Sequence, residues 1–296
     1  MKKFALFLGC TVPVRGLHYE ASARKVAARL GVELVDLREF SCCGFPAEGV
    51  DHLTSLTMAA LNLVAAENHE LNIVTLCSAC TATLTKANKL LREDAKARKE
   101  VNDILSGYGE EFKGTIRVKH FARMLLEDVG LDRIKNQVKA PLTGLKVASH
   151  YGCHYMKPSD IYEGFENPER PVTLDRLVAA TGATPVDYED KLQCCGGGIL
   201  GVDELSALRM SQAKLAHMKA AGADIMTFIC PFCAVMYDIN QKAIETKVGG
   251  KFGLPGLYYP QLLGLALGFT PKEMALELNR VKFVPGQRAG APGVPA

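Results

Sequence analysis

The sequence of 296 residues lacks three features that would each indicate a particular class of protein. It has no apolar stretch of the length that a membrane-spanning helix requires, because the longest candidate, residues 257–269, is broken by Pro260, Gln261 and several glycines. The net charge is only +3, which gives no reason to expect a nucleic-acid partner. We also expect no secretory leader, since the apolar run at residues 4–8 is too short for one. We therefore expect a cytoplasmic protein with no direct membrane span.

The sequence does contain ten cysteines, which form one five-cysteine pattern written twice. In each half a lone cysteine is followed by a Cys-Cys-Gly and then by a Cys-x-x-Cys. The first thiol set is Cys10, Cys42, Cys43, Cys77 and Cys80, and the second thiol set is Cys153, Cys194, Cys195, Cys230 and Cys233. No cysteine is left over, and such a repeat indicates two metal-cluster sites.

Cysteines in this number can also serve as disulfides, as zinc ligands or as redox dithiols. A disulfide framework is typical of small secreted domains, whereas a chain of this length can bury a large core without cross-links. Zinc takes four ligands in a closed tetrahedral site, so five thiols exceed what one zinc ion needs. Adjacent cysteines fit a multinuclear centre better, and thiolates are the usual ligands of iron–sulfur clusters. We favour iron–sulfur clusters, with zinc and dithiol redox chemistry as the remaining alternatives.

Strand and helix signals alternate along the chain, and their order repeats in the second half. Strands are expected at residues 3–9, 33–37, 72–76, 116–120, 146–149, 185–188 and 225–229, and from residue 256. Helices are expected at residues 22–30, 53–66, 81–105, 121–129, 174–180, 203–221 and 234–246. This pattern predicts an α/β fold with two pseudo-symmetric Rossmann-like halves, each with a parallel sheet, related by internal duplication. The expected domains are residues 1–138 and 139–284, followed by an extended or disordered tail at residues 285–296.

The cysteine positions have a chemical rationale in such a fold, because ligands collect at the carboxyl ends of parallel strands. The cysteines expected at strand ends are Cys10, Cys77, Cys153 and Cys230. Each Cys-x-x-Cys also opens a helix, where free N–H groups and the positive end of the helix dipole stabilise thiolates. Gly44 and Gly196 follow the paired cysteines, where they allow a sharp bend and leave N–H groups able to bond cluster sulfur.

These blocks resemble the CCG domain, and the chain resembles the B subunit of heterodisulfide reductase almost end to end. The segments that carry the resemblance are Leu8-Gly9-Cys10, Ser41-Cys42-Cys43-Gly44, His150-Tyr151-Gly152-Cys153-His154, Cys194-Cys195-Gly196, Cys230-Pro231-Phe232-Cys233 and Tyr259-Pro260-Gln261-Leu262-Leu263-Gly264. CCG domains also occur in lactate- and glycolate-oxidase accessory subunits, thiol:fumarate reductase and some succinate dehydrogenases. The segment at residues 150–154 and the chain length favour the heterodisulfide reductase type.

The resemblance implies two non-cubane [4Fe-4S] clusters that face each other across a substrate cavity, each bound by the five cysteines of one set. It implies a disulfide or thiol substrate whose S–S bond is cleaved, with each sulfur captured by an iron of one cluster. The implied electron donors are a ferredoxin-like C subunit with cubane [4Fe-4S] clusters and, behind it, a flavin A subunit. This sequence has none of the closely spaced cysteine runs of cubane ferredoxins, so its electrons must come from another chain.

Several polar residues near the cysteines are weaker candidates. His154 directly follows the lone cysteine of the second set, and His150 precedes it by three residues. Either could donate a proton to a leaving thiolate or a hydrogen bond to cluster sulfur, although a buried histidine satisfied by the backbone needs no such role. Arg15, His18 and Lys157 lie just beyond the two lone cysteines and could attract an anionic substrate. Exposed basic residues are also common without a function.

Two further features lie between Cys153 and the helix at residues 203–221. The spacing from Cys153 to Cys194 is longer than its counterpart in the first half, and the extra residues, around 157–171, are expected to line the cavity or contact a subunit. The letters Gly196-x-Gly198-x-x-Gly201 fit a dinucleotide fingerprint and precede a helix. These glycines directly follow two proposed ligands, and no βαβ unit with a suitable acidic residue accompanies them, so we expect no nucleotide there.

Two classes of function remain. In the first, the chain is the catalytic subunit of a heterodisulfide reductase-like complex and cleaves or forms a disulfide or related sulfur bond. In the second, it is a non-catalytic electron-transfer or scaffold subunit of another dehydrogenase complex, with zinc in the N-terminal site. Iron and zinc analysis separates the two, because only the first requires two four-iron centres.

Overall fold

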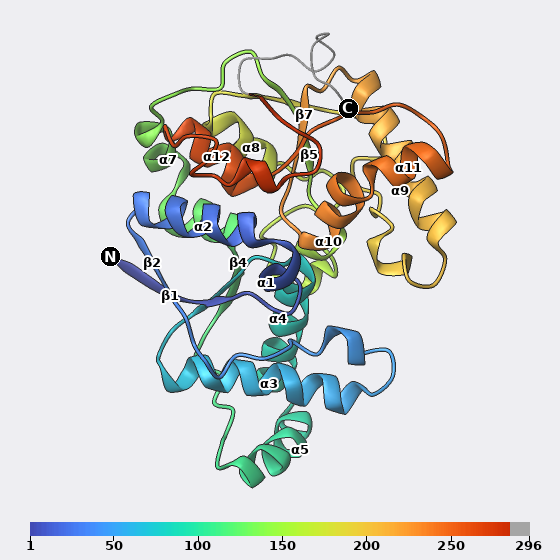
Figure 1. Ribbon diagram of the computed structural model, residues 1–296. Helices are drawn as coiled ribbons and strands as arrows, with labels where there is room; N and C mark the ends of the chain where they lie inside the picture. Colours follow the sequence, from blue (N-terminus) through green and yellow to red (C-terminus); the bar gives the residue numbers. More distant parts are fainter. Residues whose placement is uncertain (285–296) are drawn as a thin grey trace.

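Two four-stranded parallel sheets form the framework of the computed structural model, which describes residues 1–284 (Figure 1). The strands are β1 (Lys2–Phe7), β2 (Val32–Val35), β3 (Ile73–Thr75), β4 (Val118–His120), β5 (Lys146–His150), β6 (Thr184–Val186), β7 (Ile225–Phe228) and β8 (Gly256–Tyr258). The first sheet has the order β2-β1-β3-β4 and the second has the order β6-β5-β7-β8, with every neighbouring pair parallel. The shared strand order confirms the predicted α/β fold with two similar halves.

Helices join the strands, as parallel pairing requires. The helices before β5 are α1 (Val12–Arg15), α2 (Leu17–Arg29), α3 (His52–Asn68), α4 (Ser78–Glu93), α5 (Ala95–Leu105), α6 (Phe121–Met124) and α7 (Leu131–Gln137). Those after β5 are α8 (Thr173–Ala180), α9 (Glu204–Ala220), α10 (Pro231–Ala234), α11 (Gln241–Lys247) and α12 (Tyr259–Ala266). Short 3-10 or π turns are η1 (Phe45–Ala47), η2 (Ser106–Tyr108), η3 (Leu125–Val129), η4 (Cys153–Tyr155), η5 (Ser159–Tyr162), η6 (Gly197–Ile199), η7 (Val235–Ile239) and η8 (Leu276–Leu278).

Three of the expected helices are interrupted, and one of them, at 121–129, changes from α6 to the π turn η3 at Leu125. The segment at 81–105 is divided into α4 and α5 at Asp94, whose backbone is extended and whose carboxylate accepts the N–H groups of Lys96 and Ala97. An aspartate in that geometry caps a new helix instead of continuing the old one. The segment at 234–246 starts earlier, at Pro231, and contains the π turn η7 before α11.

The two halves contact each other mainly through helices that pack side by side. Helix α12 of the second half packs against α2 of the first, and α7 packs against α8, as the ribbon shows (Figure 1). The Tyr19 hydroxyl on α2 donates a hydrogen bond of 3.0 Å to the Ile229 carbonyl, directly after β7. Helix α4 also contacts η4, so the start of α4 lies beside the turn that follows β5. The boundary between residues 138 and 139 stays a prediction, and the predicted tail at 285–296 lies outside the described residues.

Candidate metal centres

Four of the ten cysteines follow the carboxyl ends of the two central strands of each sheet. Strands β1 and β3 are neighbours and lead to Cys10 and Cys77, and strands β5 and β7 are neighbours and lead to Cys153 and Cys230. Because parallel strands end on the same edge of a sheet, each pair of loops converges. The sheet topology therefore brings the lone cysteine of each thiol set close to the first cysteine of its Cys-x-x-Cys.

The Cys-x-x-Cys segments form helix starts, as predicted. Cys77 is the N-cap of α4 and Cys230 is the N-cap of α10, so the second cysteine of each pair lies in the first turn. Hydrogen bonds from the thiols of Cys233 and Cys77, together with backbone N–H groups of the same turn, hold the pKa of Cys230 well below its ordinary value. Cys77, at the same position on α4, has its pKa raised instead, so of the two N-cap cysteines only Cys230 favours the thiolate, which is the metal-binding form of cysteine.

The Cys-Cys-Gly turns depend on glycine. Gly44 and Gly196 have φ values of 90° and 84°, a region that other residues rarely adopt. A Cβ on Gly44 would lie 2.6 Å from the Ser55 carbonyl oxygen of α3, and one on Gly196 would lie 2.7 Å from the Ala207 carbonyl oxygen of α9. The Gly196 N–H donates to the Cys194 sulfur at 3.3 Å, as expected for a turn that presents N–H groups to sulfur.

The thiols suit a metal cluster. All ten cysteines are free, and six of them, Cys43, Cys77, Cys80, Cys195, Cys230 and Cys233, are buried. Thiol-to-thiol hydrogen bonds lower the pKa of one member of each Cys-Cys pair, Cys43 to about 7 and Cys194 to about 2. Each set therefore offers five sulfur donors and already favours a thiolate, the donor chemistry that iron–sulfur clusters and zinc both use.

The two thiol sets meet across the contact between the halves. The neighbouring Cys230 thiol is the main reason that the pKa of Cys77 lies well above its ordinary value. Gly152 lies at the same place, since a Cβ there would be 3.8 Å from the Ser78 hydroxyl oxygen and 3.7 Å from the Cys233 sulfur. Cysteines from both halves therefore share one region at the start of α4 and α10.

The two candidate histidines lie in different surroundings. His154 is partly buried, with Nδ1 3.5 Å from the Cys153 sulfur. Its ring packs edge-on against Phe45, which follows the Cys-Cys-Gly of the other half, with centroids 5.2 Å apart. His150 is only 1% exposed, and a nitrogen of its ring and the sulfurs of Cys195 and Cys233 all lie within 4.8 Å of one another. His154 thus lies at the contact between the sets, whereas His150 lies behind the second set.

The three basic candidates do not form one group. Arg15 is exposed and, with His18, Asp238 and Arg280, lines a cavity of about 450 Å³. Burial against Tyr258 lowers the pKa of His18 to about 4, so this histidine is uncharged at neutral pH. Lys157 is exposed on the turn after η4 and does not line that cavity.

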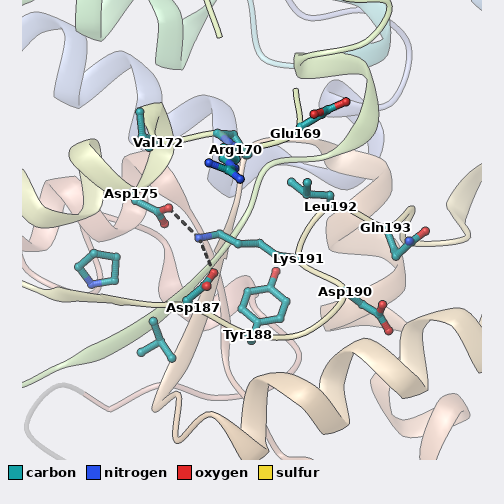
Figure 2. Close-up of a pocket in the computed structure, with 13 residues that line it drawn as sticks. Glu169, Arg170, Val172, Asp175, Asp187, Tyr188, Asp190, Lys191, Leu192 and Gln193 are labelled. Atoms are coloured by element: carbon teal, nitrogen blue, oxygen red, sulfur yellow. Dashed lines mark hydrogen bonds and ion pairs between the residues drawn. The ribbon is translucent and has the colours of Figure 1, made fainter. Parts of the chain in front are cut away.

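The residues inserted between Cys153 and Cys194 cover two places. Turn η5 packs its Ile161 and Tyr162 against Ala82 of α4. Residues 169–171 line a cavity of about 620 Å³ beside the strand end of β6, where Lys191 bridges Asp175 and Asp187 (Figure 2). This cavity also borders residues 192–193, which lead directly into Cys194.

Sequence reasoning missed two residues on the helices that support the Cys-Cys-Gly turns. Asn62 on α3 donates to the Cys42 carbonyl at 3.1 Å and accepts the Ser41 N–H at 2.8 Å. Lys214 on α9 is 1% exposed and donates to the carbonyls of residues 191 and 193, and burial lowers its pKa to about 8. Aligning one Cys-Cys-Gly on the other would have paired these two positions and singled them out.

Comparison with known proteins bears on this arrangement. A model of the cysteine-rich CCG domain matches the chain twice, over residues 4–85 and 147–238. The chain is also 41% identical over 290 residues to the B subunit of the ferredoxin/F(420)H(2)-dependent CoB-CoM heterodisulfide reductase of Methanosarcina acetivorans, with 96% of this chain and 95% of that protein covered. The chain belongs to the family of heterodisulfide reductase B subunits. Membership of this family supports iron–sulfur binding and a place in a redox complex of several subunits.

Other proteins that resemble this chain have names that describe different roles. The chain is 34% identical to the 8-methylmenaquinol:fumarate reductase membrane anchor subunit of Wolinella succinogenes, covering 94% of this chain and 96% of that protein. Within residues 1–284, no helix combines the length and apolarity needed to cross a bilayer. A crystal structure of a hypothetical protein from Helicobacter pylori has the same fold, with a TM-score of 0.77 at 16% identity over 96% of this chain and 52% of that one.

Proposed function

We propose that this chain is the subunit of a heterodisulfide reductase-type complex at which a disulfide, or a related sulfur bond, is cleaved or formed. Each thiol set would hold one non-cubane [4Fe-4S] cluster through its five cysteines. The observation that carries the proposal is the meeting of the two sets, where a Cβ on Gly152 would lie 3.8 Å from both the Ser78 hydroxyl oxygen, next to Cys77, and the Cβ of Cys230. Two one-electron centres beside one another can together supply the two electrons that cleavage of a disulfide into two thiols needs.

The reaction consumes two electrons and two protons for each disulfide and yields two thiols. Bound clusters would supply the electrons one at a time. The chain's own residues would hold the clusters: the ten cysteines would bind iron as thiolates, and the Gly196 N–H already donates to the Cys194 sulfur. His154 is the proposed proton donor to a leaving thiolate, because it is partly buried at the contact between the sets.

Exposed basic residues would attract the substrate, and partner subunits would supply the electrons. Arg15, at the edge of its cavity, and Lys157, after η4, are exposed cations that would draw in an anionic disulfide or thiol. Electrons would come from a ferredoxin-like C-type subunit with cubane [4Fe-4S] clusters, fed by a flavin A-type subunit. The ten cysteines support this division, since two sets of five leave none for a cubane cluster on this chain. A reducing compartment such as the cytoplasm suits ten free thiols.

A second function is favoured by one observation, the 34% identity to a protein named as the anchor subunit of a fumarate reductase. In that role the chain would be an electron-transfer or scaffold subunit and would cleave no disulfide. Its first thiol set could then hold zinc, because four of its five thiols satisfy a tetrahedral ion.

Metal analysis of the anaerobically purified complex tests the proposal. Two four-iron centres predict about eight irons and no zinc per chain, with disulfide-dependent oxidation of a low-potential dye. The Cys195→Ala variant removes one ligand of the second set and is expected to halve the iron and abolish turnover. About four irons with one zinc and no disulfide turnover would favour the scaffold role instead. An unchanged spectrum in the Cys195→Ala variant would refute the assignment of Cys195 as a cluster ligand.

A further inference from the structure

The two thiol sets are supported by equivalent elements but not by equivalent residues. When the Cys-Cys-Gly turns are aligned, Asn62 of α3 falls opposite Lys214 of α9. Both side chains donate to backbone carbonyls of the turn before or at their paired cysteines. The same structural task is thus performed by a neutral amide behind the first set and by a lysine behind the second.

A second difference lies at the strand ends. Phe7 is the last residue of β1 and His150 is the last residue of β5, and each stands three residues before the lone cysteine of its half. Both side chains are buried. A third pair is Leu84 and Tyr237, each four residues after the second cysteine of its Cys-x-x-Cys. In all three pairs the second half carries the more polar residue.

Two of these three polar side chains, His150 and Tyr237, lack hydrogen-bond partners within residues 1–284. Neither ring nitrogen of His150 nor the hydroxyl of Tyr237 has a hydrogen-bond partner among the described residues, although both side chains are buried and pack edge-on, with centroids 4.9 Å apart. Leaving a buried polar group unpaired costs free energy, so such groups normally face a partner. The His150 ring lies against the sulfurs of Cys195 and Cys233, which makes a sulfur-bound centre the partner that fits.

We propose that the second thiol set holds the more easily reduced of the two clusters, because His150 and Lys214 place an N–H donor and a positive charge behind it. The first set has Phe7 and Asn62 at those places and gains neither. Reduction adds negative charge to a cluster, and hydrogen bonds to its sulfurs and nearby cations stabilise that charge. An electron from the partner subunit would therefore settle first at the second set. This inference rests on the proposed function in that both sets must hold clusters.

A redox titration of the anaerobic complex, followed by electron paramagnetic resonance, tests the proposal without measuring turnover. His150→Phe and Lys214→Asn each install the residue that the first half uses. Each is expected to shift the reduction equilibrium of one cluster at least tenfold toward the oxidised form, or about 59 mV for a one-electron couple, and to leave the other unchanged. Lys219→Asn, an exposed lysine on the same helix, is the matched control and is expected to shift neither.

Ligand variants assign the two potentials to the two sets even if the substitutions above reduce cluster content. Cys195→Ala should remove the higher-potential signal, and Cys43→Ala should remove the lower-potential one. The reverse assignment, or two equal potentials in a complex with about eight irons per chain, would overturn the inference while leaving the proposed function intact. An iron content too low for two clusters would instead count against the proposed function itself.

Discussion

Replacing Gly196 by alanine is expected to damage the second thiol set through the backbone alone. Gly196 has a φ of 84°, and a Cβ there would lie 2.7 Å from the Ala207 carbonyl oxygen and 2.9 Å from its Cα. These are backbone atoms of α9, whose start is fixed by the Asp203 cap. The Ser211 hydroxyl also ties the helix to the Cys195 carbonyl at 2.7 Å. Neither the turn nor the helix can yield without moving a cysteine.

The magnitude follows from two terms. A left-handed conformation costs a residue with a Cβ about 1–2 kcal/mol, and forcing an extra methyl group into packed backbone costs about 1–3 kcal/mol. Gly196→Ala should therefore lose about 2–5 kcal/mol, which lowers the apparent unfolding temperature by roughly 4–10 °C at about 2 °C per kcal/mol. Because the Gly196 N–H also donates to the Cys194 sulfur, iron content should fall along with stability.

Two neighbouring glycines provide matched controls in the same loop. Neither Gly198 nor Gly201 has a positive φ, and a Cβ on either would meet no atom within 4 Å. Alanine at these positions should change stability by less than about 0.5 kcal/mol. Anaerobic thermal unfolding and iron analysis of the three variants would check this. Equal losses at all three positions would contradict the steric argument.

Three further predictions concern buried polar groups of the first half. Asn62→Ala removes a donor from the Cys42 carbonyl and should cost about 1–3 kcal/mol, seen as lower unfolding temperature and lower iron content with the second set unaffected. Glu67→Gln should cost a similar amount in thermal unfolding, because this buried carboxylate accepts two backbone N–H groups ahead of β4. Burial lowers the pKa of His120 to about 4, so the fold excludes a proton that the unfolded chain binds below about pH 6.5. The free energy of unfolding therefore keeps its full value above that pH and decreases by about 3 kcal/mol as the pH falls toward 4. The His120→Asn variant should lack this decrease when unfolding is measured as a function of pH. Identical pH profiles for the two proteins would contradict the prediction.

The parts of the fold that could be predicted from sequence are those with a local signal. Strand β7 is a short apolar run before Cys230, and α9 begins after an aspartate whose carboxylate accepts the Ser206 N–H, so both were expected within a residue of their bounds. The break at Asp94 was missed because it lies in a run of charged residues that reads as one solvated helix face. Asp94 acts as a helix cap only because the chain changes direction there between α4 and α5.

Positions around the site were harder to predict, because burial there depends on the other half of the molecule. His18 was expected to be a basic residue that could meet an anionic substrate, but it is buried against Tyr258 of the second half. Lys214 was not singled out at all, since a lysine on an amphipathic helix normally faces water. Its burial follows from the need to satisfy carbonyls of the Cys-Cys-Gly turn, which the linear pattern does not reveal.

Internal duplication explains why the chain has two thiol sets that meet. Residues that differ between the two halves explain how the two centres could have different reduction potentials. Two identical half-sites would give two centres of equal potential, so nothing in the chain would decide which accepts an electron first. Buried residues such as Asn62 and Lys214 differ between halves that share the same strand order. They change the charge and hydrogen bonding behind one set only. Selection on such positions could therefore order two one-electron steps without altering the ten sulfur ligands.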